Sequence, residues 1–256
     1  MIDNALPVVH LDEHLVAVSK PAGLLVHRSP IDAHETRFAL QILRRQLGRR
    51  VHAVHRLDKA TSGLLLFAFS PEVTAACAAS FEAGVVDKRY LAIVRGWTAE
   101  EGVVDHALRR EDDPPEAEPQ PARTRFRRLA TVELPFRVDR YPHSRYSLVE
   151  LQPMTGRRHQ LRRHMAHLSH PVIGDTTHGQ GRHNRLFRAE FDCHRLLLAS
   201  MQLSLPHPVT GEPLVITAPL EGAFAALVEL FGWTLSVPPE WRGPATLTSG
   251  SPSPTR

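Results

Sequence analysis

The feature that most constrains this chain is a polar turn that runs directly into an apolar segment. The turn, residues 55–63, reads His-Arg-Leu-Asp-Lys-Ala-Thr-Ser-Gly, and the apolar residues 64–69 follow without interruption. A short apolar run bounded by turn residues is typical of a strand that is buried on both faces. Such a turn can present Asp58 at the mouth of a cleft while the buried strand behind it keeps the aspartate in place.

Asp58 lies among cationic neighbours, with Arg56 and His55 just before it. Nearby positive charge favours the ionised form of a carboxyl group, which suits a nucleophile or a base near neutral pH. The alternative is an ordinary turn aspartate that caps the following segment, and the tetrapeptide alone supports both interpretations.

Hydrophobic periodicity and turn residues predict an α+β domain. The predicted helices are residues 36–48, 71–83, 157–168 and 222–231, and the predicted strands are residues 8–10, 15–20, 64–69, 89–94, 124–133, 146–152, 194–205 and 213–217. In the strand at 89–94, alternation places Tyr90, Ala92 and Val94 on one face and Leu91 and Ile93 on the other. Successive strands with interspersed helices indicate a mainly antiparallel sheet.

Composition sets the expected domain limits. We expect one domain over residues 1–237 and a disordered tail over residues 238–256. At about residues 111–121 we expect a mobile acidic and proline-rich loop that forms neither a helix nor a paired strand. Cys77 and Cys193 lie among apolar neighbours, which predicts buried free thiols in a reducing compartment. The N-terminus lacks a signal-peptide pattern, and no apolar run approaches the roughly 18 residues that span a bilayer. We therefore expect a cytoplasmic protein without a membrane partner.

Basic residues are clustered more strongly than the net charge of +4 suggests. Residues 155–174 contain no acidic residue but hold four arginines and four histidines: Arg157, Arg158, Arg162, Arg163, His159, His164, His167 and His170. No His-Glu-x-x-His motif and no Cys-x-x-Cys pair occurs, so we expect no metal site. An arginine- and histidine-rich segment of this kind indicates a surface that faces the phosphates of RNA.

Four segments, at residues 20–27, 55–63, 88–96 and 155–175, together resemble the RluA family of pseudouridine synthases, which isomerise uridine within folded RNA. The resemblance extends from about Val8 to about Trp233. Residues 94–97, 140–150 and 230–233 are most similar to the C-type enzymes of that family, which modify tRNA. We also expect no S4-like domain before the catalytic motifs, because Val8 already begins the first strand, and this absence favours tRNA over rRNA.

The resemblance implies a central mixed sheet with flanking helices and a catalytic cleft, and it implies roles for particular residues. Asp58 corresponds to the catalytic aspartate, Tyr90 lies against the uracil ring as a base or relay at C5, and Arg162 forms an ion pair with Asp58. Arg56 fills the space that the extruded base leaves, and the remaining RNA-binding residues are His55, Arg157, Arg158 and Arg163. The alternatives are a core tyrosine for Tyr90, a phosphate contact for Arg162, and an ion pair with a local carboxylate for Arg56.

The resemblance implies isomerisation of one tRNA uridine, uridine 65, by a monomer that needs no cofactor. Attack on C1′ of the ribose and removal of a ribose proton both require an ionised aspartate. The alternatives are an rRNA enzyme of the same family and a noncatalytic RNA-binding protein, which would not need Asp58. A metal-dependent nuclease would need clustered carboxylates.

Overall fold

The computed structural model describes residues 5–28, 34–110, 114 and 117–243. The strands are β1 (Val8–Leu11), β2 (Leu15–Lys20), β3 (His52–Ala53), β4 (Ser62–Ala68), β5 (Asp87–Arg95), β6 (Glu101–Asp105), β7 (Arg123–Leu134), β8 (Ser144–Pro153), β9 (Leu198–Pro206) and β10 (Pro213–Thr217). The α-helices are α1 (Ala39–Leu47), α2 (Pro71–Glu82), α3 (Gln160–His167), α4 (Gly181–Phe191) and α5 (Gly222–Leu230), and two short 3₁₀ helices, η2 (Thr234–Ser236) and η3 (Pro239–Trp241), follow.

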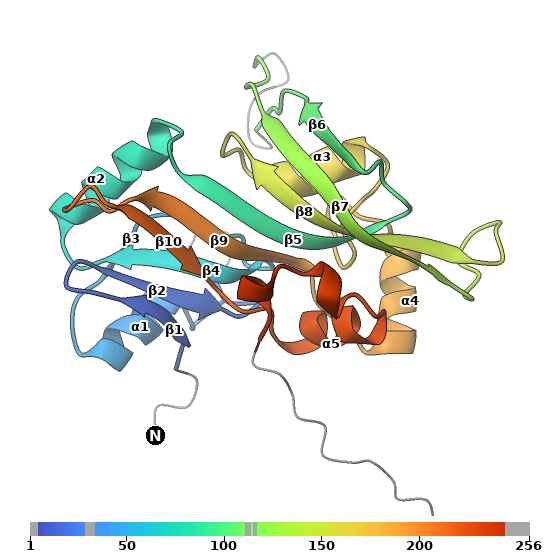
Figure 1. Ribbon diagram of the computed structural model, residues 1–256, viewed down its shortest axis with the longest axis horizontal. Coiled ribbons are helices and arrows are strands. Elements are labelled where there is room, and N and C mark those ends of the chain that lie inside the picture. The colour runs from blue at the N-terminus through green and yellow to red at the C-terminus, as the bar shows by residue number, and fades with distance from the viewer. Residues whose placement is uncertain (1–4, 29–33, 111–113, 115–116, 244–256) are drawn as a thin grey trace, which may run out of the picture.

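The described strands form one sheet in the order β1-β2-β4-β9-β5-β8-β7-β6, with β10 beside β9 and β3 beside β4 (Figure 1). The pairing of β4 with β9 is parallel, and the other pairings of named strands are antiparallel. The prediction of an α+β fold with a mixed, mainly antiparallel sheet and flanking helices is confirmed.

Strand β4 is buried along its whole length, as its apolar sequence predicts. Leu65 and Phe67 pack in one cluster with residues of α1, including Ile42 and Leu43. Leu64 and Leu66 pack in another cluster, which contains Cys77 of α2. Helices therefore cover both faces of β4, and this holds the end of the Asp58 turn rigidly.

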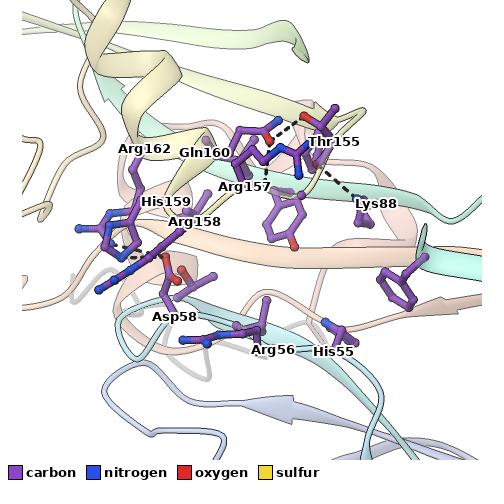
Figure 2. A pocket seen from close by; sticks show the side chains of 18 of the residues that line it. His55, Arg56, Asp58, Lys88, Thr155, Arg157, Arg158, His159, Gln160 and Arg162 are labelled. Carbon is purple, nitrogen blue, oxygen red and sulfur yellow. Dashed lines mark hydrogen bonds and ion pairs between the residues drawn. The ribbon is translucent and has the colours of Figure 1, made fainter. Parts of the chain in front are cut away.

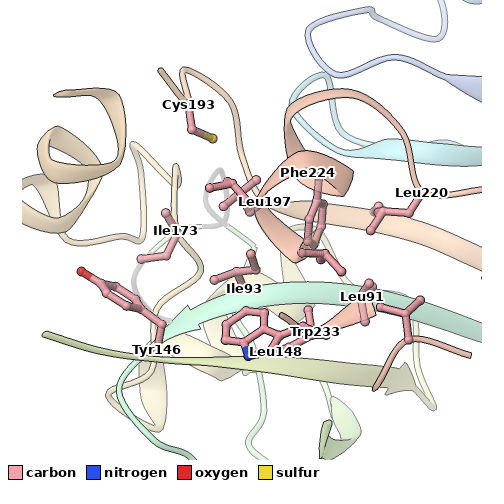
Figure 3. Packing of buried hydrophobic residues seen from close by; sticks show 14 of the residues in the cluster. Leu91, Ile93, Tyr146, Leu148, Ile173, Cys193, Leu197, Leu220, Phe224 and Trp233 are labelled. Atoms are coloured by element: carbon pink, nitrogen blue, oxygen red, sulfur yellow. The ribbon is translucent and has the colours of Figure 1, made fainter. Parts of the chain in front are cut away.

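Strand β5 shows the predicted alternation. Ala92 and Val94 belong to the cluster that contains Leu161 and Met165 of α3, and Tyr90 packs against it. Leu91 and Ile93 face the largest cluster, which α4 and α5 also enter (Figure 3). Tyr90 is therefore on the same face of the sheet as α3.

The two cysteines are free and buried, as predicted. Among the described residues, no helix has the length and apolar character needed to cross a membrane.

Helix α4 was not among the predicted elements. Its sequence, Gly-Arg-His-Asn-Arg-Leu-Phe-Arg-Ala-Glu-Phe, has few apolar residues, and Phe187 is the one that is buried in the main core. Helix α3 is shorter than predicted and begins at Gln160, because His159 adopts the left-handed conformation. Hydrophobic periodicity alone predicts neither a mostly polar helix nor a left-handed residue at the start of a helix.

The prediction of a disordered tail from Pro238 onward is wrong for its first residues. Trp241 is 2% exposed and belongs to the main apolar cluster, and its carbonyl accepts a hydrogen bond of 2.7 Å from the Leu220 N–H. The many prolines of this segment favoured disorder, but one tryptophan, Trp241, is enough to pack it against the core. Residues 244–256 lie outside the described residues.

Five of the eleven residues of the predicted acidic loop lie outside the described residues, at positions 111–113 and 115–116. Its C-terminal end is paired, contrary to the expectation that this segment forms no strand pairing. Gln120 and Leu108 exchange two backbone hydrogen bonds, of 2.9 and 3.0 Å.

Candidate active site

A pocket of about 470 Å³ lies where the Asp58 turn, β5 and the start of α3 meet (Figure 2). Its lining includes most of the predicted site residues: His55, Arg56, Asp58, Tyr90, Arg157, Arg158 and Arg162. Residues that are far apart in the sequence therefore converge on a single cavity.

The segment that begins at Lys20 anchors the turn that carries Asp58. The Lys20 ammonium group is fully buried and donates hydrogen bonds to the carbonyls of Pro21, Leu24 and Lys59, at 2.9, 2.8 and 3.2 Å. Gly23 adopts a φ of 85° and its N–H donates to the same Lys59 carbonyl at 2.8 Å. Burial lowers the pKa of Lys20 to about 7, with a further contribution from Arg195, while the charge of Asp58 opposes the shift.

The Asp58 side chain is 27% exposed, and two side chains of the described residues approach one oxygen of its carboxylate, Oδ2. Nη1 of Arg162 lies 3.5 Å from Oδ2, and Nε2 of His159 lies 3.8 Å from it. The structure thus brings Arg162 to Asp58, as the resemblance implied. The neighbouring Arg163 points elsewhere and donates to the carbonyl of Arg109 at 2.6 Å.

The main partner of Arg162 is Asp175, a residue that the sequence had not identified as part of the site. Nε and Nη2 of Arg162 donate to the two oxygens of Asp175 at 2.8 and 2.7 Å. Burial acts to raise the pKa of Asp175, but the hydrogen bonds from Arg162 and from the backbone of His178 and Thr177 outweigh it and keep that pKa below its usual value. The available signal was that Asp175 is the first carboxylate after a long stretch of cations.

Tyr90 lines the pocket as a neutral phenol. Burial raises the pKa of its hydroxyl to about 12, and the charge of Asp58 acts in the same direction, while the Ser200 hydroxyl opposes it. A tyrosine in this state donates a hydrogen bond at neutral pH, and it accepts a proton only as another leaves.

His55 supports the turn instead of presenting a charge. Its Nε2 accepts a hydrogen bond of 3.1 Å from the Leu66 N–H, and its ring stacks on Phe81 with centroids 5.2 Å apart. Burial lowers the pKa of His55 to about 4, against a backbone hydrogen bond that favours the charged form. His55 is therefore uncharged near neutral pH, and it cannot contact RNA as a cation there.

Arg56 is exposed at the pocket, and in the described part of the chain it forms no ion pair. This geometry does not support the alternative in which Arg56 binds a local carboxylate.

Gln160 shapes the loop that carries the other arginines. Its side-chain oxygen accepts from the Thr155 hydroxyl at 2.7 Å and from the Arg157 N–H at 3.0 Å. Its amide group donates to the carbonyl of Arg123 and to the hydroxyl of Thr124. Arg157 and Arg158 are consequently exposed at the rim, a position that suits contacts with phosphates.

The histidines of α3 do not gather into a metal site, and the described residues contain no group of three side chains suited to hold an ion. His164 is buried between the Thr124 hydroxyl and the His106 carbonyl, at 2.9 and 3.0 Å. His167 stacks on the ring of His106 with centroids 3.9 Å apart.

The mixed sheet and the carboxylate beside a fixed arginine in a cationic pocket define a class, the RNA pseudouridine synthases. The family model described as RNA pseudouridylate synthase matches residues 14–167, more than half of the chain. The chain belongs to this family, is of its RluA type, and is an isomerase.

Full-length relatives are similar along nearly the whole chain. Over 235 residues the chain is 51% identical to tRNA pseudouridine synthase C of Vibrio parahaemolyticus, covering 89% of this chain and 96% of the relative. Over 251 residues it is 46% identical to tRNA pseudouridine synthase C of Salmonella typhi, covering 95% and 96%. Among solved structures, human RNA pseudouridylate synthase domain containing 1 is similar with a TM-score of 0.67 and 25% identity, covering 91% of this chain and 96% of that one.

Proposed function

We propose that this protein is a tRNA pseudouridine synthase that isomerises uridine 65. The observation that carries the proposal is the position of Asp58, which lies beside Arg162 in a pocket that Tyr90 also lines. The choice of tRNA is supported by relatives that are named tRNA pseudouridine synthase C and match at about half of the aligned positions. The choice of uridine 65 rests on the C-type resemblance of residues 94–97, 140–150 and 230–233.

In the proposed reaction the bond between C1′ and N1 of uridine breaks, the uracil turns, and its C5 joins C1′. Asp58 begins the reaction in one of two ways. It attacks C1′ and departs when C5 bonds there, or it removes a ribose proton and returns it at that step. The C5 proton then leaves, and N1 of the uracil takes up a proton. Tyr90 relays the C5 proton, which a neutral phenol can do only by gaining one proton as it loses another. Substrate and product have the same atoms and oxidation state, so no cofactor is required.

The target uridine must leave its stack before it can reach Asp58, at a cost of a few kcal/mol. We assign Arg56 to the vacated space, because its exposed guanidinium is flat and can stack on the neighbouring bases. We assign Arg157 and Arg158 to phosphate contacts that hold the RNA arm over the pocket. All of these residues come from one chain, and we propose that a monomer is sufficient for activity.

The test is to incubate the purified protein with a transcribed tRNA and map pseudouridine by carbodiimide modification and reverse transcription. The matched control is the same transcript with cytidine at position 65. We expect one new signal, at position 65, that is absent from the control. Mapping of tRNA and rRNA from cells that lack the gene tests the rRNA alternative.

Intact tRNA pseudouridines together with one missing from rRNA would overturn the tRNA assignment and leave the chemistry of Asp58 in place. Binding of tRNA without any new pseudouridine in either RNA would favour the noncatalytic alternative.

A further inference from the structure

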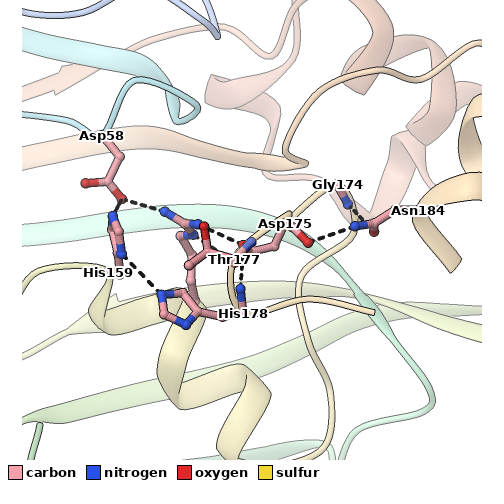
Figure 4. A network of polar contacts seen from close by, with 8 residues as sticks. Asp58, His159, Gly174, Asp175, Thr177, His178 and Asn184 are labelled. Carbon is pink, nitrogen blue, oxygen red and sulfur yellow. Dashed lines mark hydrogen bonds and ion pairs between the residues drawn. The ribbon is translucent and has the colours of Figure 1, made fainter. Parts of the chain in front are cut away.

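His159 has an unusual backbone conformation at the edge of the pocket. It precedes α3 with φ 54° and ψ 22°, in the left-handed region that residues other than glycine seldom adopt. Backbone strain of this kind persists where the surrounding structure requires it, and it concentrates at functional sites. The ring of His159 is directed at the catalytic carboxylate, with Nε2 3.8 Å from Oδ2 of Asp58 (Figure 4).

A second histidine contacts the far side of the same ring. Nδ1 of His159 lies 3.1 Å from Nε2 of His178, a hydrogen-bonding distance. The backbone N–H of His178 donates to Asp175 at 2.9 Å, so the residue that fixes Arg162 also fixes His178. The chain of contacts from His178 through His159 to Asp58 runs parallel to the chain from Asp175 through Arg162 to Asp58.

The charge of Asp58 favours a proton on Nε2 of His159, the nitrogen that faces Oδ2. A hydrogen bond from His159 to His178 would leave a lone pair on Nε2 facing the carboxylate, which is repulsive. A hydrogen bond from His178 to His159 places the proton of a neutral His159 on Nε2, where it faces Oδ2 of Asp58. The second arrangement is the favourable one.

We propose that His159, oriented by His178, is a positioning residue that holds Oδ2 of Asp58 together with Arg162. Both groups approach the same oxygen, at 3.8 and 3.5 Å. Oδ1 is then the oxygen that acts on the ribose, whether as nucleophile or as base. This inference rests on the proposed function of Asp58, and it extends that function by naming the reacting oxygen and the groups that select it.

The competing role for His159 is a simple contact with an RNA phosphate, which the basic surroundings of residues 155–174 favour. The two roles predict different losses. A phosphate contact contributes to tRNA affinity and to its salt dependence, whereas a positioning residue contributes to the rate once tRNA is bound.

The experiment uses His159→Gly and His159→Asn, because glycine and asparagine tolerate a positive φ and remove the ring without adding strain. The measurements are the single-turnover rate constant at saturating tRNA, the tRNA Kd with its salt dependence, and the melting temperature. The matched control is His143→Asn, which changes an exposed histidine in the hairpin between β7 and β8.

We expect both His159 variants to be slower than the parent by roughly 10- to 100-fold, with Kd within about threefold and an undiminished melting temperature. His178→Ala should cause a smaller loss in rate, and combining it with His159→Gly should cause no further loss.

A rate within about twofold of the parent in both His159 variants would overturn the inference. A weaker Kd with a smaller salt slope and an unchanged saturating rate would overturn it in favour of a phosphate contact. The failure of the proposed function is distinguishable, because it would appear as retained activity in Asp58→Asn.

Discussion

Asp175 holds the guanidinium of Arg162 in place, and the same guanidinium contacts Asp58 through its remaining nitrogen. The Arg162–Asp175 pair is bidentate at 2.8 and 2.7 Å, and the side chains are 7% and 1% exposed. The contact between Arg162 and Asp58 is a single one of 3.5 Å with a carboxylate that is 27% exposed. Arg162 is therefore a fixed cation, and its remaining nitrogen, Nη1, faces a carboxylate that is still partly exposed.

Asp175→Asn should impair both stability and rate. The substitution leaves the buried Arg162 with half of its counter-charge missing, and breaking a buried ion pair costs about 3–5 kcal/mol. We expect a lower free energy of unfolding by chemical denaturation and a loss in turnover of roughly 100-fold at temperatures where the variant is folded. Asp139→Asn is the control, since Asp139 also binds an arginine, Arg182, at 2.9 Å but lies outside the pocket. Normal turnover in folded Asp175→Asn would show that Arg162 needs no anchor.

Tyr90→Phe should slow isomerisation severely if the hydroxyl relays the C5 proton. The ring remains to pack against α3, so tRNA affinity should change little. Because burial raises the pKa of Tyr90 to about 12, we expect no ionisation of this residue in the parent rate profile between about pH 6 and 9. The measurement is single-turnover release of tritium from C5-labelled tRNA. Near-normal release in Tyr90→Phe would reduce Tyr90 to a packing role.

His55→Gln should change the pH dependence of stability. Burial lowers the pKa of His55 to about 4, below the ordinary value of 6.5, so the unfolded chain binds the proton more readily in this interval. The stabilisation from neutral His55 is complete above about pH 6.5, and it is lost as the pH falls toward 4, with a slope of up to about 1.4 kcal/mol per pH unit. Glutamine retains an acceptor for the Leu66 N–H but cannot titrate.

We therefore expect urea denaturation of His55→Gln to show a weaker loss of stability over that pH interval than the parent shows. The salt slope of tRNA binding should be unchanged. A slope that falls by about one phosphate contact would restore His55 to the RNA-binding residues.

A chain that ends at Pro238 should be less stable than one that ends at Gly243. The shorter chain lacks Trp241, which is buried in the main core, and removal of a buried tryptophan side chain costs about 3–5 kcal/mol. Thermal unfolding of the two truncated chains compares their stability with and without residues 239–243, and both chains lack residues 244–256. Equal melting temperatures would show that Trp241 contributes nothing to the core.

The sequence was most informative where local pattern and tertiary structure agree. The apolar run of β4, the alternation in β5 and the Asp58 turn were all predictable. A strand that is buried on both faces has a nearly continuous apolar sequence, as β4 does. The family resemblance then brought Asp58, Tyr90 and Arg162 together, although they are separated by long stretches of chain.

What the sequence did not reveal depends on contacts between distant groups. Asp175 anchors Arg162 only because the loop before α4 lies against α3. No local sequence pattern predicts that contact. The neutral state of His55 comes from burial against Phe81, and the docking of Trp241 comes from a surface built by α5 and the sheet. The left-handed conformation of His159 makes α3 begin later than predicted and directs the His159 ring at Asp58.

The most direct test of the central claim is the behaviour of Asp58→Asn. Asparagine preserves the shape of the side chain and removes the charge that the proposed chemistry requires. Single-turnover assays with carbodiimide mapping should detect no pseudouridine at position 65, while tRNA affinity stays within about tenfold of the parent. Formation of pseudouridine by Asp58→Asn at a rate within about tenfold of the parent would contradict the assignment of Asp58 as the residue that initiates isomerisation.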